Sequence, residues 1–254
     1  MAIKPIYFPE PLVEGVVQLR QNPFTMTVKL GDELMTCRCP TTWHIGNLEV
    51  AGRPCLLSRN DGADSKTLFT VEALSLDEPE AEEKKWIGIN QTATNRYMEY
   101  YLEQGGFSEM VNSTSMLRRD RLSKKANLDF IVGNTAVAIK APLVVLGLDI
   151  PEAMRVKKGR SFLPTERFMK RITALRKNSP SKRIVLVLVY LYDRPEVHTS
   201  DYSEYYDAVT PVLELIKTLE LEVWQANFII TKEFVYLDHY RPLRIVEEVA
   251  WKDF

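Results

Sequence analysis

The chain has 254 residues, of which 45% are hydrophobic and 26% are charged, and its formal net charge is −1. This length predicts one large domain or two modest ones with a sizeable core, and the composition excludes disordered, collagen-like and coiled-coil proteins. No apolar run approaches the roughly 18 residues of a membrane span, and residues 1–14 lack the basic-then-apolar pattern of a signal peptide. We therefore expect a cytoplasmic protein that does not bind membranes.

The first third of the chain consists of short apolar stretches separated by turn-forming residues. The stretches span residues 16–19, 24–30, 34–39, 54–57 and 68–74. Each has the length of a β-strand, and turn formers such as Gly31 and Gly46 lie between them. The pattern predicts a five-stranded β-barrel of the OB type in a first domain over residues 1–82. An acidic segment with a proline, residues 77–85, is interpreted as the linker to a second domain over residues 83–254.

The second part of the chain alternates helix and strand patterns. Helical periodicity covers residues 93–104, 166–177 and 205–219, and strand-like runs cover residues 128–132, 136–139, 183–192, 222–230 and 234–237. The run over 183–192 is apolar almost throughout, as expected of a strand buried on both faces. Gly133 and Asn134 predict a tight turn that joins the first two strands into a hairpin. The sequence therefore predicts a mixed α/β domain behind a β-barrel.

The small net charge hides a strongly basic middle segment. Residues 118–183 contain 17 Lys and Arg against 5 Asp and Glu, whereas 10 stand against 16 in residues 1–117 and 6 against 13 in residues 184–254. Cations that converge on one face bind phosphates and release counterions, so the segment predicts a nucleic-acid-binding surface. The alternative is a solvated basic face that the acidic flanks balance in three dimensions.

The predicted hairpin carries two residues with catalytic potential. Asp129 lies near the end of one strand and Lys140 near the end of the other, so both can reach one pocket beside the basic helix. In metal-dependent nucleases with such a hairpin, two carboxylates hold divalent cations and a lysine orients the attacking water. Ala138 occupies the position of the second carboxylate and cannot bind a cation. We expect Asp129 to hold Mg²⁺ or Mn²⁺ weakly, if at all, with Asp120 or Glu166 as candidates for a second ligand.

Short motifs in both parts of the chain resemble one known family. In the first part they are Pro23-Phe24, CPTTWHIG at 39–46, KTLFT at 66–70, WIGIN at 86–90 and Asn95-Arg96, and in the second part LDF at 128–130, AIK at 138–140, Phe162 and TER at 165–167. Together they resemble the sugar fermentation stimulation protein family over nearly the whole chain. The resemblance implies an OB-like domain followed by a nuclease-type domain of the PD-(D/E)XK class, and a protein that cleaves or binds DNA or RNA.

The chain departs from the pattern of that family at positions that bear on activity. Ala138 stands where the family has the glutamate of a Glu-x-Lys signature, His44 where it has an arginine, and Arg171 where it has a histidine. Ala126 and Asn127 replace a Ser-Arg pair. The resemblance therefore implies a nuclease scaffold in which metal-dependent cleavage is weak or abolished, either by natural loss or by deliberate substitution of the active site.

The residues expected to contact nucleic acid come mainly from the basic segment. They are Arg118, Arg119, Arg121, Lys124, Lys125, Arg167, Lys170 and Arg171, together with Lys66 and His44 of the first domain. The main alternative is a non-catalytic DNA-binding or regulatory protein, and a more distant one is a small-ligand or protein-binding module. A zinc site formed by Cys37, Cys39, His44 and Cys55 is disfavoured, because no C-x-x-C pair accompanies these residues.

Overall fold

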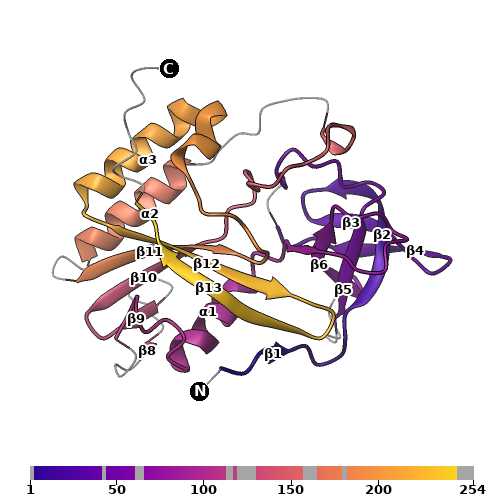
Figure 1. Ribbon diagram of the computed structural model, residues 1–254, viewed down its shortest axis with the longest axis horizontal. Coiled ribbons are helices and arrows are strands. Elements are labelled where there is room, and N and C mark those ends of the chain that lie inside the picture. Colours follow the sequence, from indigo (N-terminus) through magenta and orange to yellow (C-terminus); the bar gives the residue numbers. More distant parts are fainter. Residues whose placement is uncertain are drawn as a thin grey trace.

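The computed structural model describes residues 3–41, 44–60, 66–112, 117–118, 130–156, 165–178 and 182–244. In this part of the chain a β-barrel lies beside a seven-stranded mixed sheet with helices on both faces (Figure 1). The mixed α/β class predicted from the sequence is confirmed. No helix within these ranges is long and apolar enough to cross a membrane.

The barrel is built from strands in the first third of the chain. They are β2 (Val13–Asn22), β3 (Thr25–Leu30), β4 (Glu33–Arg38), β5 (Pro54–Arg59), β6 (Phe69–Ser75) and β7 (Trp86–Gly88). The strand order is β4-β3-β2-β5-β6-β7, and a parallel pairing of β4 with β6, at Arg38 and Thr70, closes the first five strands. Closure leaves β4 and β6 without an open edge and confirms the predicted OB-like barrel.

Alternating burial explains why these segments form strands and where the cysteines lie. On β3, Met26 and Val28 are buried at a spacing of two, which points them into the barrel. Cys37, Cys39 and Cys55 are free and buried, and burial raises the pKa of the Cys37 thiol to about 11. Because the thiolate is the zinc ligand, a thiol that resists deprotonation is a poor one. The described residues thus favour core packing over zinc binding for these cysteines.

The mixed sheet is built from seven strands. They are β1 (Ile6–Tyr7), β8 (Leu117–Arg118), β9 (Phe130–Val132), β10 (Thr135–Lys140), β11 (Arg183–Tyr190), β12 (Glu222–Ile230) and β13 (Phe234–Pro242), in the order β1-β13-β12-β11-β10-β9-β8. Strands β10, β11 and β12 are parallel, and their neighbours are antiparallel. Val132 pairs with Thr135 across a turn in which Gly133 has a φ of +56°, so the predicted hairpin is confirmed.

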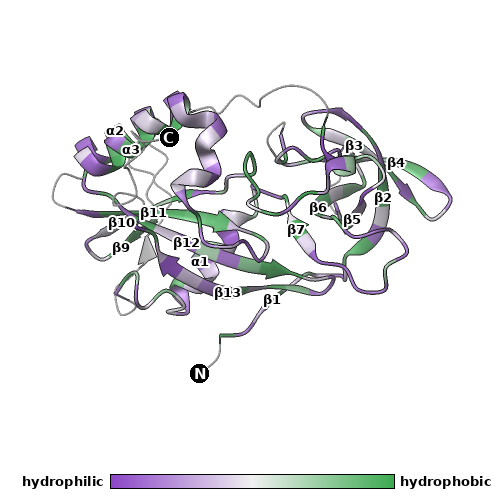
Figure 2. Cartoon of the chain, turned by 45° about the horizontal axis from the view of Figure 1, so that its top comes forward, coloured by the Kyte–Doolittle hydropathy of each residue, from purple (hydrophilic) through white to green (hydrophobic). Residues whose placement is uncertain are grey.

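Helices supply the crossovers that parallel strands require. Helix α1 (Thr94–Glu103) covers one face of the sheet, and α2 (Thr165–Asn178) and α3 (Tyr206–Thr218) cover the other, with two 3₁₀ turns, η1 (Glu152–Met154) and η2 (Thr199–Tyr205). Figure 2 shows hydrophobic residues along the central strands and hydrophilic bands on α2 and α3. On β10, Ala138 packs in the same core cluster as Ile172 of α2, whereas Val137 packs with Tyr97 of α1. The central strands are therefore buried on both faces.

The barrel and the sheet are joined by several local contacts. Strand β1 pairs with β13 of the sheet, and Gly88 of β7 forms an isolated β-bridge with Leu191. Glu14 of β2 forms ion pairs with Lys84 and Lys232, both at 2.8 Å. Near the boundary predicted at residue 82, β7 still belongs to the barrel, while β1 at the start of the chain belongs to the sheet.

Candidate functional site

The end of β10 holds two of the residues predicted to be catalytic. Ala138 and Lys140 are two residues apart, and Ala138 packs with core residues of α2 and α3, so both lie on the sheet face that these helices cover. Ala138 is 1% exposed and pairs with Leu186 of the neighbouring strand β11. Its methyl group offers no ligand atom. Asp129, the other predicted catalytic and metal-binding residue, lies outside the described residues.

The surroundings of Lys140 disfavour its positive charge. Burial lowers the pKa of Lys140, and the nearby guanidinium groups of Arg171 and Arg167 lower it further. Lys140 Nζ lies 6.0 Å from the centre of the Phe168 ring, a cation–π contact. Among the described residues, no carboxylate forms an ion pair with Lys140. Lys140, Arg167 and Arg171 therefore form a group of like charges, called here the basic cluster.

A cavity of about 580 Å³ opens beside Lys140, at the junction of the barrel, the sheet and α3. The barrel contributes Phe24, Thr41 and His44 to its lining, and most of the remaining lining is apolar. His44 and Lys140, which are 96 positions apart in the sequence, thus line one cavity. The structure brings together two residues that were predicted separately, one from each part of the chain.

The barrel side of the cavity also carries positive potential. Burial lowers the pKa of His44, and the neighbouring guanidinium of Arg20 lowers it further. Arg20 Nη2 donates a hydrogen bond to the backbone oxygen of Pro23 at 3.2 Å, which holds the guanidinium beside the turn that carries Phe24. Phe24 is 71% exposed, a large fraction for an aromatic side chain. The Arg20 guanidinium therefore supplies positive charge on the barrel side of the junction, opposite the basic cluster, while the lowered pKa favours neutral His44.

Gln91 connects the barrel to the end of β10, a role that sequence reasoning missed. Thr41 Oγ1 donates to Gln91 Oε1 at 3.1 Å, and Gln91 Nε2 donates to the backbone oxygen of Ala141. The amide thus binds the residue after Lys140 and the barrel loop that precedes His44. The only signal in the sequence was its position directly after the WIGIN motif at 86–90.

The loop after β11 forms another wall of the cavity, and a buried polar network holds it. Gln225 Nε2 donates to the backbone oxygen of Arg194 at 3.0 Å, and its Oε1 accepts from the amide of Val197 at 2.9 Å. Asn227 Nδ2 donates to the same Arg194 oxygen at 2.6 Å. His198, next in the chain, lines the cavity. Polar residues in an apolar strand were the available signal for this network.

The other predicted nucleic-acid residues take different positions. Lys66 is exposed in the loop between β5 and β6, and Lys170 is exposed with its ammonium 3.8 Å from the Glu166 carboxylate. Glu166, a candidate second metal ligand, is therefore an exposed helix residue paired with Lys170. Outside the described side chains lie Arg118, Arg119, Asp120, Arg121, Lys124 and Lys125.

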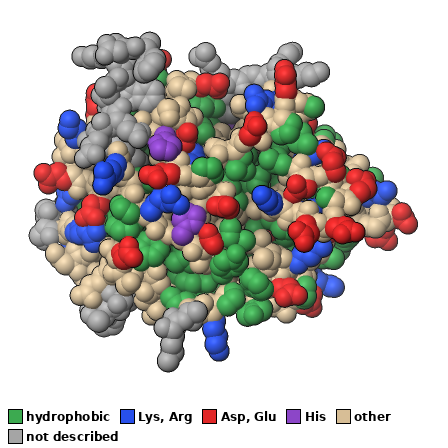
Figure 3. All heavy atoms as spheres, viewed as in Figure 1, with side chains coloured by type: hydrophobic (Ala, Val, Ile, Leu, Met, Phe, Trp, Pro, Cys, Tyr) green, Lys and Arg blue, Asp and Glu red, His purple; other side chains and the backbone are tan. Residues whose placement is uncertain are grey.

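Some cations of the basic segment are paired with acceptors of the same chain. Arg183 donates to both carboxylate oxygens of Glu222, and Arg176 donates to the backbone oxygens of Lys182 and Leu219. In the face shown in Figure 3, acidic side chains gather over the barrel end of the molecule. The excess of cations in residues 118–183 therefore overstates the surface that is available to a polyanion.

Comparisons with known proteins agree with this fold. No protein-family model matches the chain. A sugar fermentation stimulation protein homolog from Pelagibacter ubique is 24% identical over 207 residues, which cover 79% of this chain and 84% of that protein. A homolog of the same name from Geotalea daltonii is 23% identical over 249 residues, 94% and 99% of the two chains. The structure of Pyrococcus furiosus SfsA in complex with Ca²⁺ superposes with a TM-score of 0.66 at 15% identity, over 96% of this chain and 99% of the other. Over nearly its whole length the chain is thus similar to sugar fermentation stimulation proteins, and it shares its fold with P. furiosus SfsA.

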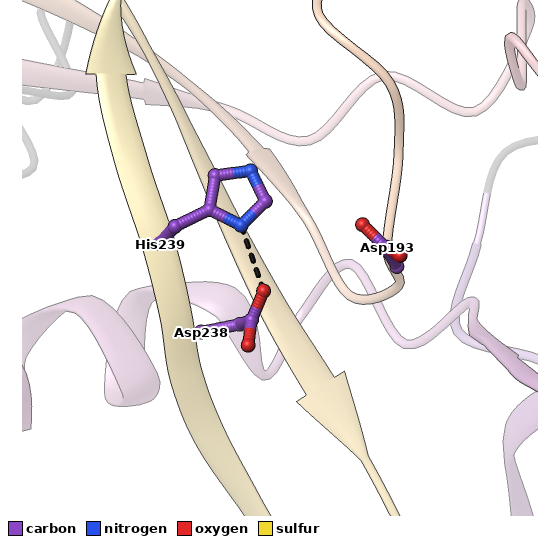
Figure 4. Close-up of side chains that lie close together, drawn as sticks. All are labelled: Asp193, Asp238 and His239. Atoms are coloured by element: carbon purple, nitrogen blue, oxygen red, sulfur yellow. Dashed lines mark hydrogen bonds and ion pairs between the residues drawn. The ribbon is translucent and has the colours of Figure 1, made fainter.

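One group of potential metal ligands involves none of the residues of the basic cluster. Asp193, Asp238 and His239 each offer a ligand atom, and these atoms lie within 4.8 Å of one another (Figure 4). A register shift between β12 and β13 at Asn227 and Phe228 leaves Asp238 without a partner in the ladder and turns it toward His239.

Both ring nitrogens of His239 are already hydrogen-bonded. Nδ1 lies 2.7 Å from Asp238 Oδ2, and Nε2 lies 2.7 Å from Arg241 Nη2. A cation would have to displace the Arg241 guanidinium, which also repels it. As described, the three residues form a charge network on the sheet rather than an open metal site.

Proposed function

We propose that this protein binds the phosphate backbone of nucleic acid at the basic cluster of Lys140, Arg167 and Arg171. The position of Lys140 carries the proposal. Lys140 is half-buried, its ammonium group lies beside two guanidinium groups, and it has no ion-pair partner among the described carboxylates. Such a group is unfavourable alone and becomes favourable when an anion arrives, because a phosphate accepts charge-assisted hydrogen bonds from all three cations.

The barrel side supports a nucleic-acid strand that runs across the junction. OB-like barrels bind single strands with basic grooves and aromatic side chains on which bases stack. Phe24 supplies an exposed ring and His44 a polar one in the lining that the barrel contributes, and the Arg20 guanidinium beside His44 supplies positive potential. A strand whose phosphate contacts Lys140 would therefore have an aromatic platform within the same site.

Cleavage is proposed to be weak or absent in this chain. The described residues at the end of β10 do not fit a divalent cation, because Ala138 lacks a carboxylate and its charged neighbours are cations. The predicted Mg²⁺ or Mn²⁺ would depend on Asp129, which lies outside the described residues, and the Ca²⁺ of the P. furiosus structure belongs to that protein. We therefore assign no catalytic step and propose a nucleic-acid clamp on a nuclease-type scaffold.

Fluorescence anisotropy with labelled single- and double-stranded DNA and RNA tests the binding proposal. We expect affinity to fall steeply as salt rises, and Lys140→Ala to weaken binding about tenfold and to make the salt slope shallower by about one. Lys217→Ala removes an exposed lysine of α3 and serves as the matched control, with affinity within about twofold of the parent. Salt-insensitive binding, or equal affinities for the two variants, would contradict the proposal.

Restoring the missing carboxylate tests the scaffold. We expect the parent to leave labelled DNA and RNA intact with Mg²⁺ or Mn²⁺, and Ala138→Glu to introduce metal-dependent cleavage if Asp129 can act as the second ligand. Ala138→Gln has nearly the same shape without the charge and should stay inactive. Cleavage by the parent at a rate comparable to that of Ala138→Glu would refute the view that Ala138 disables this chain. If no variant cleaves DNA or RNA while nucleic-acid binding is retained, the result favours a protein that only binds nucleic acid.

A further inference from the structure

We infer that the cavity beneath α3 is a binding site for a small amphiphilic anion, a molecule with an apolar body and one carboxylate or phosphate group. Its binding does not depend on the proposed function, because the inference rests on the apolar depth of the cavity as well as on Lys140. If both are correct, the amphiphile and nucleic acid compete for Lys140.

The apolar residues of α3 do not close against the sheet beneath them. Val209, Val212 and Leu213 are half-buried and line the cavity, and Ile216 is the helix residue that is fully buried. The facing sheet surface is aliphatic as well, with Leu188 of β11 in the lining. An empty apolar cavity forgoes dispersion contacts and lowers stability, so an apolar molecule that enters recovers those contacts. The volume of about 580 Å³ lies within the range of small-molecule pockets.

The charge of the lining selects an anion. Lys140 is the one Lys, Arg, Asp or Glu among the described residues that line the cavity. Arg167 and Arg171 add positive potential behind it. Gln91 and Thr41 bring polar groups to the same end of the cavity. Gln91 donates a hydrogen bond to the backbone oxygen of Ala141, which follows Lys140, and it accepts one from Thr41. One cation at the edge of an aliphatic chamber matches a molecule with one anionic group and an apolar body.

A nucleobase fits the deep part of the cavity less well than an alkyl body. Bases gain most from flat aromatic rings, whereas the lining that α3, β11 and β12 contribute consists of branched aliphatic side chains. The aromatic rings of Phe, Tyr and Trp residues in the lining come from elsewhere: Phe24 from the barrel side, Phe168 from beside Lys140 and Tyr202 from η2. We therefore assign the aliphatic depth to the amphiphile.

Isothermal titration calorimetry on the full chain tests the inference with four probes below their micellar concentrations. These are dodecanoate, dodecyl phosphate, dodecanol and inorganic phosphate. We expect at least one of the two anionic amphiphiles to bind at least about tenfold more tightly than dodecanol and inorganic phosphate, since only an amphiphile uses both parts of the site. Whichever of the two binds more tightly identifies the head group. Absence of binding by both, or equal binding of dodecanol, would overturn the inference.

Two pairs of variants locate the ligand. Lys140→Ala should weaken the anionic amphiphiles about tenfold and leave dodecanol unchanged, whereas Lys217→Ala should change neither. Val212→Trp fills the cavity and should abolish binding, whereas Lys217→Trp places the same ring on the exposed side of α3 and should not.

Circular dichroism confirms that each variant is folded. If Val212→Trp does not fold, the Lys140 pair decides the question. Undiminished binding in folded Val212→Trp, or in Lys140→Ala, would refute this location. If neither anionic amphiphile binds while nucleic-acid binding remains salt-sensitive, this inference is overturned and the proposed function stands.

Discussion

Two cations near neighbouring strand ends, Arg194 after β11 and Lys140 at the end of β10, have opposite surroundings. Arg194 is 0% exposed, and its Nη2 donates to Asp201 Oδ2 at 2.8 Å. Its Nη1 donates to the backbone oxygen of Pro195 at 2.9 Å, and its guanidinium carbon lies 4.9 Å from the centre of the Tyr190 ring. Lys140 instead lies beside two more cations, and no described carboxylate pairs with it.

The difference separates a structural charge from a functional one. A buried cation whose charge is balanced by a carboxylate inside the fold fixes local structure, as Arg194 with Asp201 does for the loop that forms one cavity wall. A half-buried cation among like charges, with no ion-pair partner among the described carboxylates, is destabilised and is relieved when an anion binds; such perturbed groups gather at functional sites. The partners of these two cations, more than the difference in their burial, distinguish their roles.

Removal of the paired cation should have the largest effect on stability. Arg194→Met leaves the Asp201 carboxylate without its partner and removes the contact with Tyr190, so we expect a loss of about 3 kcal/mol in the free energy of unfolding. Urea denaturation followed by circular dichroism measures it. Arg38→Met, on an exposed position of β4, is the control and should change stability by less than about 0.5 kcal/mol. A loss below about 1 kcal/mol for Arg194→Met would remove the basis of the comparison.

A glycine substitution tests the packing around Arg194 without removing its charge. Gly147 has a φ of +65°, and a β-carbon there would lie 2.6 Å from the guanidinium carbon of Arg194. Gly31 has a φ of +59° with nothing within 4 Å of such an atom. We expect Gly147→Ala to lose about 2 kcal/mol and Gly31→Ala about 1 kcal/mol, because only the first adds a clash to the backbone strain. Equal losses in the same urea titration would show that the guanidinium moves aside freely.

Removal of Lys140, which pairs with none of the described carboxylates, should act in the opposite direction. Lys140→Met replaces a desolvated charge beside two guanidinium groups with an apolar chain, so we expect a gain of about 1 kcal/mol in the free energy of unfolding. Nucleic-acid affinity should fall in the same variant. Lys217→Met, which changes an exposed lysine, should alter stability by less than about 0.5 kcal/mol. A clear loss of stability in Lys140→Met would instead make Lys140 a structural residue like Arg194.

Sequence patterns predicted the fold better than the site. The spacing of apolar residues and the turn at Gly133 depend on local rules, so the barrel strands and the β9–β10 hairpin were predictable. The cavity depends on long-range contacts such as that of Gln91 with Ala141, which no local pattern reveals. Counting cations also could not separate Arg183, which pairs with Glu222, from Lys140, which pairs with no carboxylate that the structure describes. His44 reached the candidate site through family resemblance and not through spacing.

The Arg183–Glu222 pair lies between these two extremes, because it is paired but partly exposed. The hydrogen bonds from Arg183 lower the pKa of Glu222 below the ordinary value of 4.5. A carboxyl group with a depressed pKa stabilises the fold above its unfolded pKa, and this contribution is lost as the pH falls through the lower folded value. Because the two side chains are 37% and 45% exposed, solvent screening limits the contribution to about 0.5 kcal/mol.

We therefore expect Glu222→Gln to lower the free energy of unfolding by about this amount at pH 6. In parallel urea titrations, the difference from the parent should shrink as the pH falls below 4.5. A pH-independent difference would mean that Glu222 acts through shape and hydrogen bonding, and the comparison would then apply only to buried charges.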